Sequence, residues 1–186
     1  MKPMAARGEL LGIRVVVFDS REAVKLFREG FYGKPFGIRK PKEPEFDAPL
    51  ELSLLEALYL VEKGLLEVWV PGRGEPLSLD ELREKARRAI ADLDQQYLVY
   101  KELRDGGYVV RSGLKFGSDF AVYEYGPGID HAPFLVHVMD MHADLDPIEI
   151  VRAGRLSHAV RKTFIIAAVD KDRGQARYIT FKWYKP

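Results

Sequence analysis

The sequence predicts a protein of the α+β or α/β class that is built from two domains. The first half alternates helical patterns with short β-branched runs, whereas the second half is mostly strand-like and contains a single helix. A chain of 186 residues is long enough for two small domains that each bury a core. We place the boundary at residue 92, which gives domains of 1–92 and 93–186.

Composition narrows the class of protein. Apolar residues make up 47% of the chain and charged residues 31%, as expected for a globular protein. The charged fraction and the lack of cysteine fit an intracellular protein, and both are also typical of proteins from thermophiles. The lack of cysteine excludes disulfides and cysteine-based metal sites. The net charge of +1 means that an anionic partner would need a local basic patch. Because no apolar run suits a signal peptide or a membrane span, we expect a soluble cytoplasmic protein.

The first domain begins with a strand and a helix. The β-branched run at 12–19 predicts the strand, and Asp19 or Ser20 can cap a helix over 21–30 that ends at Gly30. Residues 32–49 then contain four prolines and two glycines, which predicts a long loop. This loop carries three basic residues close together, namely Arg39, Lys40 and Lys42.

Two capping boxes mark the next helices. Ser53 and Glu56 open a helix that ends at Gly64, and the run "EVWV" after it predicts a short strand. Ser78 and Glu81 have the same spacing and open a run that is helical in character as far as 106–107. We expect this long run to bend near 92–94, at the domain boundary.

The second domain has the predicted order β-β-β-α-β-β. The helix covers 146–162, with proline in its first turn and Arg161–Lys162 at its end. The strands are predicted at 108–113, 115–125, 132–140, 163–170 and 177–184.

The segment "FAVYEYGPGIDHAPFLV" places Tyr123 at the end of one strand and His131 at the start of the next. Both side chains can transfer protons, which suggests a catalytic pair across one tight loop. Strand alternation puts Tyr123 with Asp119 and Tyr125 on the less apolar face, where a ligand could reach it. The ordinary alternative is a tyrosine at a sheet rim and a histidine at the surface.

The end of the second-domain helix is basic. At helical spacing Arg155, His158 and Lys162 share one face, opposite apolar residues that include Ile148 and Val151. Such a patch suits phosphate, although a lysine in a last turn is also favoured by the helix dipole. The four histidines do not have the spacing of a metal site, so we expect neither a metal nor a cofactor.

At these residues the sequence resembles the archaeal tRNA-splicing endonucleases. The resemblance covers roughly 95–186, with "QQYLVYKELRDGGYVVRSGLKFG" as its most specific block, and extends more loosely over 8–90. It implies an N-terminal domain followed by a nuclease domain whose mixed central sheet is flanked by helices. The 32–49 loop looks like the extra loop of crenarchaeal catalytic subunits, which work with a second, structural subunit.

The resemblance implies a catalytic triad of Tyr123, His131 and Lys162, each of which matches a position of the family's motif. It implies metal-independent cleavage of precursor tRNA at bulge–helix–bulge junctions, as in a tRNA-intron lyase. The ribose 2′-OH attacks the phosphate and leaves 2′,3′-cyclic phosphate and 5′-OH ends. Tyrosine would be the base, with its pKa lowered by a nearby lysine, histidine the acid and lysine the electrostatic stabiliser.

The resemblance also implies how RNA and other subunits are bound. Arg155 and Arg177 match arginines that clamp a bulged base, and we expect the basic loop to hold the phosphate backbone. The aromatic terminal strand at 176–184 would pair with another subunit, giving an α2β2 assembly, a homotetramer or a homodimer. The acidic segment 140–146 is either a docking loop or a solvated loop.

Three alternatives remain open at this point. The chain could be a non-catalytic subunit of the same complex, although such subunits usually lack part of the triad. It could be a nucleic-acid-binding module without chemistry, or a metal-dependent nuclease that uses Asp119 and Glu124.

Overall fold

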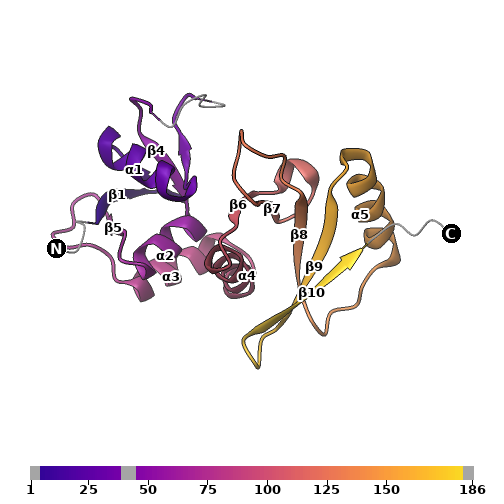
Figure 1. The fold of residues 1–186 in the computed structure, drawn as a ribbon. Coiled ribbons are helices and arrows are strands. Elements are labelled where there is room, and N and C mark those ends of the chain that lie inside the picture. Colours follow the sequence, from indigo (N-terminus) through magenta and orange to yellow (C-terminus); the bar gives the residue numbers. More distant parts are fainter. Residues whose placement is uncertain (1–4, 39–44, 182–186) are drawn as a thin grey trace. The chain divides into compact units, whose positions relative to one another are not determined.

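The computed structural model describes residues 5–38 and 45–181, and the chain divides into two compact units after Leu93 (Figure 1). The basic loop residues Arg39, Lys40 and Lys42 lie outside the described residues. Within the described ranges, no helix has the length and apolar character needed to cross a membrane.

The N-terminal unit contains a five-stranded mixed sheet in the order β3-β4-β2-β1-β5. β1 and β5 pair in parallel, and the other neighbours are antiparallel. The strand at 6–11 was not predicted, because the sequence "ARGELL" contains no β-branched residue. The strands are β1 (Ala6–Leu11), β2 (Arg14–Val17), β3 (Lys34–Pro35), β4 (Leu50–Ser53) and β5 (Leu66–Trp69).

Three helices complete this unit: α1 (Ser20–Gly30), α2 (Leu54–Glu62) and α3 (Leu79–Ala89). The Asp19 side chain caps α1 by accepting hydrogen bonds from the backbone N–H groups of Arg21 and Glu22. The predicted end at Gly30 is confirmed, and the next residue, Phe31, caps the helix in the left-handed conformation with a φ of 53°. The Phe31 ring packs edge-on against Phe27 at 5.4 Å, which helps a non-glycine residue to hold this conformation.

Both predicted capping boxes are confirmed, at Ser53–Glu56 and Ser78–Glu81. Glu56 is buried and also accepts a 2.8 Å hydrogen bond from the Gly33 N–H, so it fixes the chain before β3 as well as the start of α2. The predicted bend is confirmed too: Asp92 has a φ of 53° and separates α3 from α4 (Leu93–Asp105).

The C-terminal unit has the predicted order β-β-β-α-β-β. Its sheet runs β10-β9-β8-β7-β6, with β8 and β9 parallel and the other pairs antiparallel. The strand predicted at 115–125 is shorter, since residues 114–116 form a 3₁₀ turn. The elements after α4 are β6 (Val109–Ser112), η1 (Leu114–Phe116), β7 (Phe120–Tyr123), β8 (Phe134–Asp140), α5 (Pro147–Val160), β9 (Thr163–Asp170) and β10 (Gln175–Phe181).

Helices cover both faces of this sheet. On one face Phe120 contacts Tyr100 of α4, with ring centres 5.9 Å apart. On the other face α5 lies against β9 (Figure 1). The expectation that Ile148 and Val151 of α5 pack inward is wrong, because they are 73% and 60% exposed. The face towards α5 carries an apolar cluster of Ala121, Ala132, Leu135, Phe164, Ile166 and Ala168.

Candidate active site

The register of the C-terminal sheet brings three chain segments to one end of it. Val122 on β7 pairs with Phe134 on β8, and Phe134 pairs with Thr163 on β9. β7 is antiparallel to β8, and β8 is parallel to β9, so the residue after Val122 and the residues before Phe134 and Thr163 share that end. Those residues are Tyr123, the His131–Pro133 segment and Lys162.

Lys162 is bonded to the loop that carries His131. Its ammonium group donates a hydrogen bond to the carbonyl oxygen of Ala132, the residue after the histidine. The Thr163 N–H donates to the Pro133 carbonyl at 2.8 Å, so the start of β9 is also joined to this loop by a backbone hydrogen bond. The Lys162 Nζ atom also lies 5.3 Å from the centre of the Phe116 ring. The lysine therefore has a fixed place beside the loop.

The structure corrects the predicted basic helix face. α5 ends at Val160, and Arg161 has a φ of 54°, so Lys162 lies beyond the helix and directly precedes β9. Its charge consequently does not act on a last helical turn. Arg155 is exposed on α5, and the side chain of His158 is outside the part of the chain that the structure describes.

Tyr123 is half-buried and packs against the apolar cluster, so the prediction of a less apolar face is wrong. Burial raises the pKa of the Tyr123 hydroxyl, and the negative charge of Asp130 raises it further. The nearby cation that lowers this pKa is Arg111 on β6. We expected a lysine to lower the pKa of Tyr123, but the cation that does so is an arginine. Its effect on this pKa is weaker than the opposite effect of burial.

Asp130 closes the loop between Tyr123 and His131. Its two carboxylate oxygens accept hydrogen bonds from the Glu124 N–H at 2.9 Å and the Gly126 N–H at 2.8 Å. The Asp130 N–H in turn donates to the Gly126 carbonyl at 3.1 Å. Sequence reasoning missed this residue, although an aspartate after a Gly-Pro-Gly turn is a known pattern for side-chain bonds to the turn backbone.

Lys115 is a second cation near Lys162 and was also not predicted. Its Nζ atom lies 4.6 Å from the Phe116 ring centre, so both lysines approach the same ring. The pKa of Lys162 is lowered by its partial burial and by the positive charge of Lys115, whereas Asp130 acts in the opposite direction. Two cations held near one ring form a basic site suited to phosphate.

The predicted Arg177 does not join this group within one chain. It pairs with Ala168 on β9, five residues along the strand from Thr163. At about 3.3 Å per residue this places its backbone roughly 16 Å from the candidate site. His131 is exposed on the loop.

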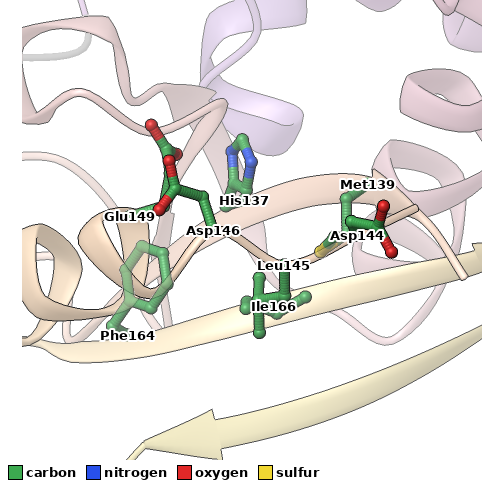
Figure 2. Close-up of a pocket in the computed structure, with 8 residues that line it drawn as sticks. All are labelled: His137, Met139, Asp144, Leu145, Asp146, Glu149, Phe164 and Ile166. Atoms are coloured by element: carbon green, nitrogen blue, oxygen red, sulfur yellow. The ribbon is translucent and has the colours of Figure 1, made fainter.

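Two cavities of this unit are lined by described residues, and Tyr123 lines neither of them. One of about 210 Å³ lies between β8, β9 and α5, where Figure 2 shows His137 beside Asp146 and Glu149 above Phe164. The Nδ1 atom of His137 is 2.9 Å from the Asp119 carboxylate, so this histidine has a structural partner. A second cavity, of about 500 Å³, lies on the α4 face. Among the described residues no group of three or more His, Asp or Glu side chains is placed to hold a metal ion.

Comparison with known proteins identifies the family. The tRNA intron endonuclease catalytic C-terminal domain matches residues 93–178, and the tRNA intron endonuclease N-terminal domain matches residues 6–83. A tRNA-splicing endonuclease of Hyperthermus butylicus is 57% identical over 180 residues, which cover 97% of this chain and 99% of that protein. Proteins of the same name are 48% identical in Pyrobaculum arsenaticum and 44% identical in Saccharolobus islandicus, each over 95% of this chain and at least 97% of the relative. The chain therefore belongs to the tRNA intron endonuclease family.

Proposed function

We propose that this chain is a catalytic subunit that cleaves precursor tRNA at its intron junctions without a metal ion. The observation that carries the proposal is the meeting of Tyr123, the His131 loop and Lys162 at one end of the sheet in the catalytic domain. A non-catalytic subunit would not need all three residues. In this proposal residues 93–186 form the nuclease domain and residues 1–92 the N-terminal domain.

The proposed reaction is an attack of the ribose 2′-OH on the adjacent phosphate. Tyr123 takes the 2′-OH proton as the O–P bond forms, and His131 gives a proton to the departing 5′-oxygen as its bond to phosphorus breaks. Lys162 stabilises the extra negative charge of the phosphorane. The products are a 2′,3′-cyclic phosphate and a 5′-OH, so no water or cofactor is consumed.

We propose that the exposed arginines Arg155 and Arg177 contact bulge bases and that the basic loop contacts phosphates. Each neutralised phosphate contact contributes to the salt dependence of binding. Replacing Arg39, Lys40 and Lys42 together by glutamine should weaken RNA binding and flatten its dependence on salt. An unchanged slope in a filter-binding titration would remove the loop from the RNA interface.

The proposed assembly pairs this chain with a second, structural subunit in an α2β2 complex, with a homotetramer or homodimer as alternatives. β10 is the last strand of its sheet, and most of its residues are exposed, which suits pairing with another chain. The acidic segment 140–146 is largely exposed and remains a candidate docking loop. A cytoplasmic location, where precursor tRNA is processed in archaea, is part of this proposal.

The test is to incubate the protein with a bulge–helix–bulge RNA in EDTA, with and without a candidate partner subunit. The expected result is cleavage that leaves cyclic-phosphate ends. Binding without cleavage under both conditions would indicate a non-catalytic subunit or a binding module, and cleavage that requires Mg²⁺ would indicate a metal-dependent nuclease. His131→Ala should bind the RNA and fail to cut it, and cleavage near the wild-type rate would exclude the acid role.

A further inference from the structure

We propose that Asp130 is a positioning residue of this active site, whose carboxylate holds the backbone of the 124–133 loop so that Tyr123, His131 and Lys162 stay aligned. This inference rests on the proposed function, because it concerns the geometry of the same site. It adds a residue that touches no substrate but on which the placement of the three others depends.

The first observation is that both oxygens of the Asp130 carboxylate accept backbone hydrogen bonds within the loop. One oxygen accepts from the residue that directly follows Tyr123, and the other accepts from Gly126 in the turn. The Gly126 carbonyl accepts from both the Ile129 and the Asp130 N–H groups at 3.1 Å. The end of β7 and the residue before His131 are therefore joined by one side chain, across a glycine-rich turn that would otherwise be free to change shape.

The second observation concerns the other side of His131. The following residue, Ala132, is buried and accepts the hydrogen bond of Lys162. His131 thus lies between two fixed backbone points, one made by Asp130 and one by Lys162. Because its own side chain is exposed, packing does not place it, and the backbone contacts on either side must do so.

The charge of Asp130 reaches two of the three residues that it aligns. It raises the pKa of Tyr123, where burial acts in the same direction and Arg111 acts against both. It also raises the pKa of Lys162, against partial burial and the charge of Lys115. Removing this negative charge should therefore lower both pKa values, which a purely structural contact would not do.

Asp130→Asn is the informative substitution. It keeps the shape of the side chain and one oxygen acceptor, but it removes the charge and sets an amide NH₂ against one of the two backbone donors. Asp119→Asn is the matched control: it removes the same charge from a carboxylate that accepts from the Val138 N–H at 2.7 Å and pairs with His137. Asp119 precedes β7, at the end of that strand away from Tyr123.

The experiment measures three quantities on the full chain, with its partner subunit where cleavage requires one. Amide hydrogen exchange reports on the Glu124 and Gly126 N–H groups, ¹³Cζ NMR titration reports the Tyr123 pKa, and single-turnover cleavage in EDTA reports the chemistry. For Asp130→Asn we expect faster exchange at both amides, a lower Tyr123 pKa and a cleavage rate about 10- to 100-fold below wild type, because small displacements of reacting groups have effects of this size. Asp119→Asn should change none of the three at this loop.

Two results would overturn the proposal. One is unchanged exchange and an unchanged Tyr123 pKa in Asp130→Asn. The other is a cleavage rate that does not separate Asp130 from an ordinary residue: either a rate within about twofold of wild type, or a reduction no larger than that of Asp119→Asn and accompanied by an equal loss of folded protein. Exchange and titration need no activity, so they still decide the positioning role if the wild-type protein fails to cleave RNA, a failure that would instead contradict the proposed function.

Discussion

Replacing Lys162 by methionine should separate the electrostatic role of this lysine from its structural one. The substitution removes the bond to the Ala132 carbonyl and the contact with the Phe116 ring. A hydrogen bond from a charged donor contributes about 1.5–3 kcal/mol and an exposed cation–π contact about 0.5–1 kcal/mol. Since Lys162 is only partly buried, we take the lower values and expect a loss of about 2 kcal/mol in stability.

The expected loss of catalysis is larger than this loss of stability. Removing one preorganised charge-stabilising group from a transition state typically slows a reaction about 10²- to 10³-fold, or about 3–4 kcal/mol. At a temperature where the variant is still folded, the weaker folding does not reduce the rate, so the full catalytic deficit should be visible. The two effects are therefore distinguishable in one set of measurements.

The assay compares single-turnover cleavage at saturating protein with thermal unfolding of the same samples. Lys171→Met is the matched control, because Lys171 pairs with Asp140 at 3.0 Å and lies at the opposite end of β8 and β9 from the candidate site. We expect the control to cleave at the wild-type rate. A folded Lys162→Met protein that cleaves within about fivefold of wild type would refute the electrostatic role.

Four further changes give distinct outcomes. Tyr123→Phe keeps the packed ring, so we expect unchanged thermal unfolding but cleavage about 10²- to 10⁴-fold slower in single-turnover assays. Because burial and a neighbouring cation lower the pKa of Lys162, its charge is lost at lower pH than that of an ordinary lysine, and Lys162→Arg should move the alkaline fall of the pH–rate profile to higher pH. Arg111→Gln removes the cation that lowers the Tyr123 pKa, so NMR titration should show a higher pKa and cleavage about three- to tenfold slower at fixed pH. Glu56→Ala removes the carboxylate that accepts from the Gly33 N–H and also removes a capping box, which should cost about 2–3 kcal/mol in urea unfolding and leave the pH–rate profile unchanged.

Local signals in the sequence predicted most of the elements. The capping serines Ser53 and Ser78 mark helix starts because their bonds are made within four residues, and the same locality made the bend at Asp92 visible. The strand at 6–11 was missed because its own composition does not favour a strand, and its place in the sheet depends on pairing with both β2 and the distant β5. The left-handed cap at Phe31, next to the correctly predicted helix end, goes with an aromatic contact that no sequence pattern specifies.

The sequence indicates a candidate set of site residues, whose roles stay a prediction, but it does not indicate their arrangement. The order Tyr123, His131, Lys162 can be matched to a family motif by reading along the chain. The register that places Lys162 beside the His131 loop cannot, because it depends on parallel pairing of β8 with β9 after a crossover through α5. Helical spacing predicted that Arg155 and Lys162 share one helix face. That prediction is wrong, since the helix ends before the lysine.

Asp130 explains an otherwise unfavourable choice of base. Burial already opposes ionisation of Tyr123, and a carboxylate nearby opposes it further, so only a very small fraction of this tyrosine is ionised at neutral pH. Yet the same carboxylate acts against the lowering of the Lys162 pKa by burial and by Lys115, and it fixes the turn before His131. A base that is rarely ionised lowers the rate by a constant factor, whereas a displaced acid or an uncharged lysine removes the transition state's stabilisation. In the proposed mechanism the alignment of His131 and Lys162 outweighs the loss of basicity at Tyr123, which is why we expect Asp130→Asn to slow cleavage even though it makes Tyr123 a more available base.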